Sequence, residues 1–335
     1  MASSTIARVL AVLCVWALRA ALIGGLGGAL DSALAAPACP PPPAAPGPAQ
    51  WREAARHDRG FLWSIERDGR TSYLYGSLHV GRPQWQRPGP RVAAALAASD
   101  VLALELDPAN PEVAQAMMSD AGAQAPEWPA ALRERLARQI AAACLPEGAL
   151  ARMAPALQLM VLEVLQARWA GLDPAYAQES VLASAARAAG RPVRALETAA
   201  LQKKALMADA DPGQAAQALD ELADGSARRQ IERMASVWEH GDYARLARYA
   251  QWCGCADTEA GRAALRALND DRNPGLADGI EALAREGRRV FAAVGSLHMV
   301  GPRGLPALLA ARGFTVRRIA FEAPVQQSSP NHQGD

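Results

Sequence analysis

The chain has 335 residues, of which half are hydrophobic and 21% are charged, so it is long and apolar enough to bury a large core. Thirty-five basic side chains against 34 acidic ones leave a formal charge of +1, and no stretch concentrates Lys or Arg with interleaved aromatic residues in the way that a nucleic-acid groove needs. We therefore expect no nucleic-acid partner. Aromatic residues make up only 5%, which favours closely packed helices around a small sheet over a β-sandwich.

The first 36 residues are typical of a signal peptide. An apolar stretch runs up to Ala33-Leu34-Ala35, which has the small residues of a cleavage site. We expect the mature protein to begin near Ala36 and to lie in the periplasm or outside the cell. Because Arg19 interrupts the apolar stretch, a retained membrane anchor is one alternative, and lipoprotein cleavage before Cys39 is another. Contact with a membrane is expected only through such an uncleaved N-terminus.

The remaining chain divides by composition into three parts. Residues 37–60 begin with PACPPPPAAPGP, which favours an extended proline-rich linker. Residues 61–322 carry all the predicted strands and helices and are expected to form the folded domain. Residues 323–335 are a polar tail.

The cysteines outside the signal peptide are expected to meet an oxidising compartment, where disulfides form. Cys253 and Cys255 stand too close together for an ordinary zinc knuckle, and no second pair completes a four-thiolate site. We expect Cys144 to form a disulfide with Cys253 or Cys255, without a preference between the two.

The folded part opens with a predicted β-hairpin. Residues 61–66 and 71–79 are two runs rich in aromatic and β-forming residues, and Asp68-Gly69 between them is typical of a hairpin turn. A helix is predicted over residues 90–99. The apolar run Val101-Leu102-Ala103-Leu104-Glu105-Leu106 then predicts a strand that is buried on both faces.

Helices dominate the middle of the chain, and strands return near its end. Helices are predicted over residues 130–143, 156–170 and 176–189, a strand over 191–197, several medium helices over 198–285, a strand over 289–294, a helix over 302–312 and a strand over 314–321. Strands from both ends of the chain must share one sheet, or several apolar strands would be left unpaired. We therefore predict one α/β domain, with a mixed central sheet and a large helical insertion.

Two of the five histidines lie in identical tetrapeptides, Gly76-Ser77-Leu78-His79 and Gly295-Ser296-Leu297-His298. Each tetrapeptide ends a predicted strand, and Val-Gly follows each within a few residues. The glycine lets the backbone turn sharply and lets a second strand end or a ligand approach closely. The shared residue types and positions indicate a single functional site.

Four predicted strand ends carry side chains that suit a site, namely His79, Glu105, Glu197 and His298. Ligands of α/β sheets bind at the carboxyl ends of the strands. Two imidazoles and two carboxylates at one edge are suited to a divalent metal with an open coordination position, or, without a metal, to acid/base catalysis. Glu197 has a structural alternative, as an N-cap of the next helix. Arg272 is interpreted as a guanidinium near the site that binds a carboxylate, a solvated helix-end Arg being the alternative.

Five blocks of the sequence resemble, in order, the successive blocks of TraB/GumN (TraB/PrgY/GumN) proteins: LWSIERDGRTSYLYGSLHVGRPQW, SDVLALELD, GRPVRALET, LNDDRN and VFAAVGSLHMVGPRGLPALLAARGFTVRRI. The resemblance covers residues 61–319. This family is similar to the Tiki metalloproteases, and more distantly to erythromycin esterase-like and ChaN-like proteins. The resemblance implies an α/β fold of that kind, with metal-dependent hydrolysis in at least the Tiki branch, and it implies a site more firmly than a reaction. It points by position to His79, His298 and Glu105, and also to Glu197 and Arg272.

The leading hypothesis is a metal-dependent hydrolase, a peptidase that acts on a peptide or small-molecule substrate outside the cytoplasm. His79 and His298 would bind Mn²⁺, Co²⁺ or Zn²⁺, and Glu105 would be a ligand or the general base. Glu197 and Arg272 are the other predicted catalytic residues. One alternative is a non-catalytic protein that sequesters a peptide or takes part in envelope polysaccharide assembly. A metal or haem carrier is the other.

Overall fold

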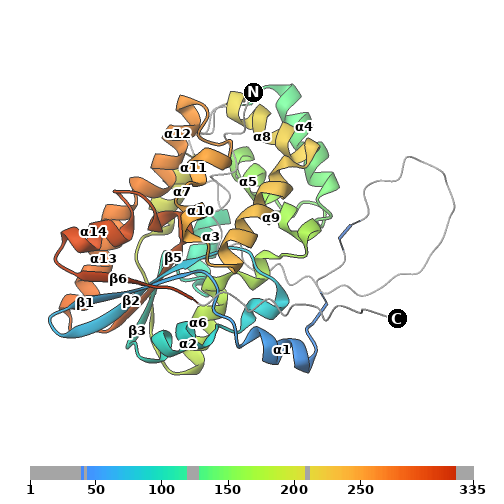
Figure 1. Ribbon diagram of the computed structural model, residues 1–335. Coiled ribbons are helices and arrows are strands. Elements are labelled where there is room, and N and C mark those ends of the chain that lie inside the picture. Colours follow the sequence, from blue (N-terminus) through green and yellow to red (C-terminus); the bar gives the residue numbers. More distant parts are fainter. Residues whose placement is uncertain (1–38, 41–43, 119–127, 208–211, 322–335) are drawn as a thin grey trace, which may run out of the picture.

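The computed structural model describes residues 39–40, 44–118, 128–207 and 212–321 (Figure 1). Its centre is a six-stranded mixed sheet with the order β4-β3-β5-β2-β1-β6. The strands are β1 Phe61–Arg67, β2 Arg70–Ser77, β3 Val101–Leu104, β4 Val193–Ala195, β5 Val290–Gly295 and β6 Thr315–Ile319. Strands from both ends of the chain thus share one sheet, as predicted, and the α/β class is confirmed.

The predicted hairpin is present. Strands β1 and β2 pair antiparallel from Phe61 opposite Gly76 to Arg67 opposite Arg70, so only two residues form the turn. Asp68 has φ 51° and Gly69 has φ 71°. Positive φ at both central residues is the requirement of the type I′ turn, which matches the twist of the strands it joins. β6 then pairs antiparallel with the other side of β1.

The remaining pairings are parallel and set the position of the strand ends. β5 lies between β2 and β3, and β4 follows β3, all four running in the same direction. Every residue of β3 and β5 is buried. This explains the unbroken apolar runs of their sequences, because both faces of the sheet are covered at these strands. The carboxyl ends of β4, β3, β5 and β2 lie next to one another in that order.

Helices cover the sheet and form a large lobe at one end of it (Figure 1). The α-helices are α1 Pro48–Ala54, α2 Pro90–Ala97, α3 Pro111–Met118, α4 Ala130–Ala142, α5 Pro155–Leu165, α6 Gln178–Ala188, α7 Ala199–Met207, α8 Pro212–Asp224, α9 Ser226–Glu239, α10 Tyr243–Leu246, α11 Tyr249–Trp252, α12 Glu259–Leu265, α13 Asn273–Arg285 and α14 Leu305–Ala311. The lobe consists of helices from the long middle of the chain, which agrees with the predicted helical insertion.

Some predicted boundaries differ from the structure. The helix predicted over residues 156–170 is α-helical only to Leu165 and continues as a short 3₁₀ segment, η3 Gln166–Ala170, which ends at Gly171 with φ 68°. Helix α3 lies in the long helical region predicted after the strand at residues 101–106, but its bounds were not predicted. The segment predicted as a linker contains helix α1, and the guanidinium of Arg87 lies over the ring of Trp51 in that helix.

The expected disulfide partner of Cys144 is wrong. Cys144 is bonded to Cys39, 105 residues away, and Cys253 is bonded to Cys255. Cys253 and Cys255 are fully buried in the core, whereas Cys144 lies near the surface. Gly254 between the buried pair has φ 66°, a conformation that is easy for glycine and lets the chain turn back on itself. The Cys39–Cys144 bond ties the proline-rich segment to the domain.

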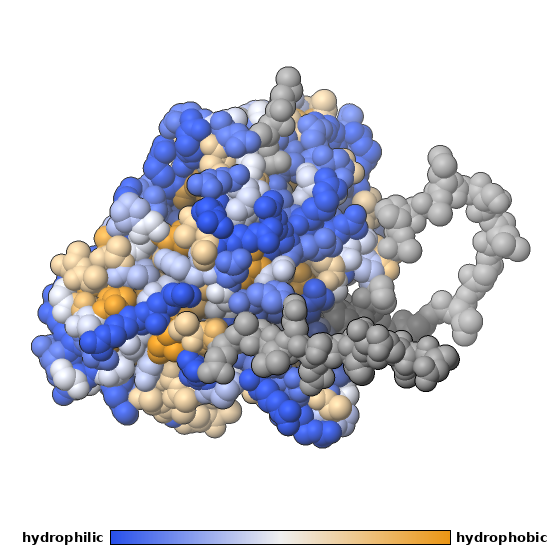
Figure 2. All heavy atoms as spheres, in the orientation of Figure 1, coloured by the Kyte–Doolittle hydropathy of each residue, from blue (hydrophilic) through white to orange (hydrophobic). Residues whose placement is uncertain are grey.

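The surface is largely hydrophilic on the face shown in Figure 2, with small separate apolar patches. Among the described residues, Leu201 is the large hydrophobic side chain that stands exposed. No helix in the described ranges has the length and apolar character needed to cross a membrane.

Candidate active site

All five predicted site residues meet at the carboxyl edge of the parallel strands. Glu197, Glu105, His298 and His79 follow β4, β3, β5 and β2 in the order in which those strands lie in the sheet. Arg272 stands at the N-terminal boundary of α13, whose residues contact β5. Neighbouring parallel strands end at the same edge, so residues far apart in sequence come together there.

The two Gly-Ser-Leu-His motifs pack directly against each other. The Ser296 hydroxyl donates to the Ser77 carbonyl at 2.7 Å. A Cβ on Gly76 would lie 3.2 Å from Cγ of Met299 and 3.3 Å from the side chain of Phe61, which is closer than ordinary van der Waals contact. The glycine of the first motif therefore allows the close approach of the segment that follows the second motif, and a larger residue would require Met299 or Phe61 to shift by a few tenths of an ångström.

Arg272 is the centre of the polar cluster. Its Nε donates to Glu197 at 3.1 Å, and its Nη2 donates to both Glu105 and Glu197. Its Nη1 donates to the Leu268 carbonyl at 2.8 Å and lies 3.3 Å from Nε2 of His298. A guanidinium has five N–H groups, so all of them have an acceptor within the protein and none is left for a substrate carboxylate in this arrangement.

Glu105 is held as a carboxylate. The Gly295 N–H donates to its Oε1 at 2.7 Å, and Gln202 donates to its Oε2 at 3.1 Å. Burial alone would raise the pKa of Glu105, but Arg272, the two motif histidines and the Gly295 N–H together lower it to about 2. Glu197 behaves differently, because burial raises its pKa in spite of Arg272. Of the two carboxyl groups, Glu105 is the one fixed in the charged form at neutral pH.

His298 is completely buried and neutral. Its Nδ1 lies 2.6 Å from Oδ1 of Asn273, whose amide nitrogen in turn donates to the Arg303 carbonyl at 2.8 Å. Oδ1 can only accept, so Nδ1 carries the proton and Nε2 presents a lone pair. Nε2 lies 3.8 Å from Oε1 of Glu105. Burial lowers the pKa of His298 to about 3, with the positive charge of Arg272 acting in the same direction and Glu105 opposing both.

His79 has a carboxylate beside it. Its Nδ1 lies 3.0 Å from Oε1 of Glu179, an ion-pair distance, although the ring is not aligned for a hydrogen bond. The same oxygen accepts from the Ser77 hydroxyl. Burial alone would lower the pKa of His79, but Glu179 outweighs it and raises the pKa. Nε2 of His79 and Oε2 of Glu179 are buried without a hydrogen-bond partner.

Comparison with known families identifies the family of the chain. The TraB/PrgY/gumN family matches residues 61–318, from the start of β1 into β6. The chain belongs to the TraB/PrgY/gumN family. No curated protein and no solved structure matches the chain.

The family resemblance did not point to three polar residues that complete the cluster. Glu179, Gln202 and Asn273 come from the helical part of the chain and contact His79, Glu105 and His298 in turn. Asn273 lies inside the LNDDRN block, directly after Arg272, and is the one that the sequence could have indicated. Glu179 and Gln202 sit in ordinary helical sequence with no distinguishing pattern.

Glu179 reaches His79 because a short loop contact fixes the start of α6. Gly81 and Asp173 exchange two backbone hydrogen bonds, and the Gln178 N–H donates to the Leu78 carbonyl at 3.0 Å. A Cβ on Gly81 would lie 2.2 Å from the Tyr176 carbonyl oxygen, so only glycine allows this contact. The Val-Gly that follows the first motif therefore places the first turn of α6 next to His79 in this TraB/PrgY/gumN protein.

The donor set of this family member fits a divalent cation in chemistry. A metal-bound histidine usually holds its second ring nitrogen against an oxygen, as both motif histidines do here. Nε2 of His79 has no partner, and Glu105 supplies an anionic oxygen. Nε2 of His298 has a lone pair, but it accepts from Arg272 in this structure, so an ion could use it only after Arg272 moves away. Among the described residues, however, no three His, Cys, Asp or Glu side chains lie close enough together to hold an ion. Arg272 lies between Glu105 and Glu197, where it provides the positive charge itself.

Proposed function

We propose that this protein is a metal-dependent hydrolase that acts outside the cytoplasm, with peptides as its substrate class. The observation that carries the proposal is the shared orientation of the two motif histidines. Each has Nδ1 beside a side-chain oxygen, Glu179 for His79 and Asn273 for His298, so that Nε2 is the nitrogen that would bind a ligand. For His298 this requires Arg272 to release the hydrogen bond that it donates to Nε2. Bound Mn²⁺, Co²⁺ or Zn²⁺ would lower the pKa of a coordinated water toward neutrality.

The residues of the cluster would have different roles in the reaction. His79, His298 and Glu105 would hold the ion after moving closer together than they lie in the structure, and the Gly295 N–H fixes the Glu105 carboxylate. Glu197, with its raised pKa, is suited to take up or release a proton near the reacting bond. Arg272 and Gln202 join the two carboxylates, so the distance between Glu105 and Glu197 is set by the protein.

Burial of the cluster strengthens the interactions between its charged groups and restricts the access of a substrate to them. The side chains of Arg272, Glu105 and Glu197 are 7%, 4% and 6% exposed. Charges at such positions interact far more strongly than in water. A peptide bond can reach them only after the covering side chains move, which favours an unfolded or extended peptide over a folded protein as substrate.

Location outside the cytoplasm is supported by the cysteines. Cys39–Cys144 and Cys253–Cys255 are both paired in the structure. Disulfides persist in the periplasm and outside the cell and are rare in the cytosol. Together with the predicted signal peptide over residues 1–36, which lies outside the described residues, this supports export.

The first test is metal content. Wild-type protein, purified without chelator and then dialysed against Mn²⁺, Co²⁺ or Zn²⁺, should retain about one ion per chain. The double variant His79→Ala, His298→Ala should lose that ion. His57→Ala, His240→Ala is the matched control, because both of these histidines lie near the surface away from the motifs and should leave the metal content unchanged. Stoichiometric metal in the motif variant would remove the proposed mechanism.

The second test separates an enzyme from a binding protein. A library of short peptides incubated with each ion and analysed by mass spectrometry should reveal cleavage by the wild type. Glu105→Gln removes charge at constant shape and should lower the cleavage rate by about a hundredfold or more. Glu197→Gln is the matched variant and should cost less, since the Glu197 carboxyl is already closer to its neutral form. Peptide binding without cleavage under every ion would instead identify a non-catalytic binding protein.

A further inference from the structure

A polar hollow lies at the edge of the sheet opposite the candidate active site. It is lined by residues at the β1–β2 turn, the end of α13 and the start of β6: Arg67, Asp68, Arg70, Ser72, Ala284, Arg285, Arg288 and Phe314. Arg70 begins β2, and Arg288 lies just before β5, so this hollow is at the amino edge of the parallel strands. The candidate active site is at their carboxyl edge. The hollow, of about 20 Å³, has room for a group the size of a water molecule.

The lining carries an excess of positive charge. Four arginines stand against the single carboxylate of Asp68, which is 82% exposed. Glu281, just outside the lining, forms ion pairs with Arg67 at 2.6 Å and with Arg285 at 2.7 Å. Within the described part of the chain, Arg70 and Arg288 form no side-chain hydrogen bond or ion pair. Two guanidiniums at the rim therefore have no direct ion-pair partner, although Arg288 is near enough to Asp100 to help lower the pKa of that carboxyl group.

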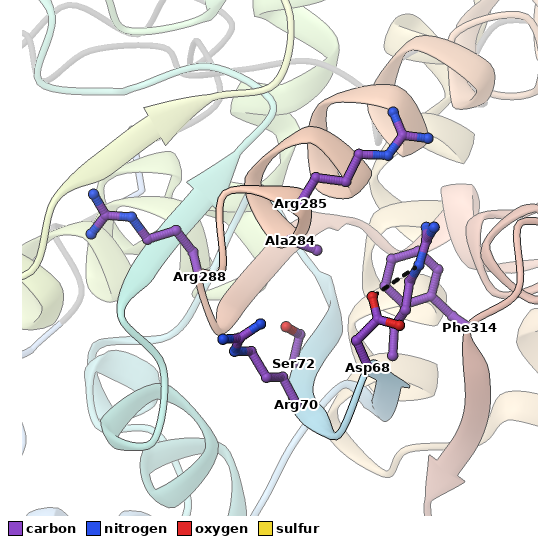
Figure 3. Close-up of a pocket in the computed structure, with 8 residues that line it drawn as sticks. Asp68, Arg70, Ser72, Ala284, Arg285, Arg288 and Phe314 are labelled. Atoms are coloured by element: carbon purple, nitrogen blue, oxygen red, sulfur yellow. Dashed lines mark ion pairs between the residues drawn. The ribbon is translucent and has the colours of Figure 1, made fainter.

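The floor of the hollow adds a hydrogen-bond donor. Ser72 is 3% exposed, and its Oγ accepts from the Val290 N–H at 2.9 Å. The hydroxyl proton finds no acceptor among the residues that the structure describes. A buried donor without an acceptor is unfavourable, and an anionic oxygen in the hollow would satisfy it. In Figure 3, Arg70 lies beside Ser72, whereas Arg285 and Arg288 extend outward from the rim.

We propose that this hollow binds a phosphate group, with one oxygen on the Ser72 hydroxyl and the others on the guanidiniums of Arg70 and Arg288. Two unpaired guanidiniums match the two negative charges of a phosphate monoester, and the planar fork of arginine suits its oxygens. The volume of the hollow admits one oxygen, so the rest of the group stays at the rim within reach of the long arginine side chains. The site is independent of the metal and of the hydrolase activity.

The test uses the full mature chain and measures binding of inorganic phosphate by calorimetry, with sodium chloride matched for ionic strength. Arg70→Gln with Arg288→Gln should weaken binding by about tenfold or more. The control, Arg138→Gln with Arg152→Gln, changes the same net charge at exposed positions of the helical lobe and should have no effect. Asp68→Asn should strengthen binding several-fold, and because Asn accepts positive φ next to Gly69, the hairpin turn is kept.

A further arm identifies the source of the phosphate group. Vesicles of phosphatidylcholine with and without phosphatidylglycerol are tested for co-sedimentation. Binding of free phosphate supports a soluble phosphate ligand, and binding only of the phosphatidylglycerol vesicles supports a lipid headgroup, each with loss in the Arg70→Gln, Arg288→Gln variant. Equal binding in this variant and in wild type, or an effect that matched chloride reproduces, would overturn the proposal, as would no binding in either arm.

Discussion

Replacement of Arg272 by methionine tests the charge balance of the cluster most directly. The variant fills a similar volume but leaves the Glu105 and Glu197 carboxylates, 4% and 6% exposed, without their shared cation. Removing one partner of a buried ion pair typically costs about 3–5 kcal/mol. Glu197 can relieve part of this by taking up a proton, because its pKa is already raised. We therefore expect about 3 kcal/mol, which lowers the melting temperature by roughly 6–12 °C.

The assay is chemical denaturation at pH 7.5 in the presence of chelator, with the disulfides intact. The loss in free energy of unfolding caused by Arg272→Met should become smaller as the pH falls to about 5, because the unpaired carboxyl groups then bind protons in the folded variant. The triple variant Arg272→Met, Glu105→Gln, Glu197→Gln should recover most of the loss, since no uncompensated charge remains. A cost below about 1 kcal/mol, or one that does not change with pH, would show that the cluster is not an ion-pair network that depends on Arg272.

Three further predictions follow from single features. In the presence of chelator, the free energy of unfolding should fall by up to about 1.4 kcal/mol per pH unit between pH 6.5 and the pKa of His298 in the folded protein, about 3. The reason is that in this range only the unfolded chain binds a proton at His298. Urea titrations of wild type and His298→Asn would show the difference. Gly76→Ala should cost about 1–3 kcal/mol by thermal melting because its Cβ would meet Met299 at 3.2 Å, while Gly275→Ala in α13, with open space around it, should be neutral or stabilising. Glu179→Gln should weaken metal affinity by about tenfold to a hundredfold in a competition titration, since it removes the carboxylate that orients His79; an unchanged affinity would mean that Glu179 has no such role.

The local features of the fold followed from local sequence. Asp68-Gly69 alone specifies the hairpin turn, and the apolar run before Glu105 specifies a strand buried on both faces. Once the strands are parallel neighbours, the meeting of His79, Glu105, Glu197 and His298 follows from geometry, because their strands end at one edge. This part of the site needed only strand assignments.

What depends on packing between distant segments could not be predicted. Glu179 reaches His79 only because Gly81 permits a close contact with the loop before α6, and nothing in the helical sequence around Glu179 shows this. The disulfide partner of Cys144 depends on where the segment around Cys39 returns to the domain. Likewise, the sequence indicates Arg272 near the site, but not that all of its N–H groups are used inside the protein.

The two identical tetrapeptides end in histidines with opposite electrostatic properties. His79 stands beside the carboxylate of Glu179, which raises its pKa, whereas His298 pairs with the neutral amide of Asn273, and burial lowers its pKa to about 3. Groups whose environments push their pKa values apart are suited to different roles in proton transfer. A metal ion needs both imidazoles neutral, so ion binding must release the His79 proton at any pH below its raised pKa. His298 is already neutral and has only to lose the hydrogen bond from Arg272. The pH dependence of metal affinity should therefore follow His79 alone. Replacing Glu179 by Gln should move that dependence to lower pH, which distinguishes a carboxylate that tunes His79 from one that only packs beside it.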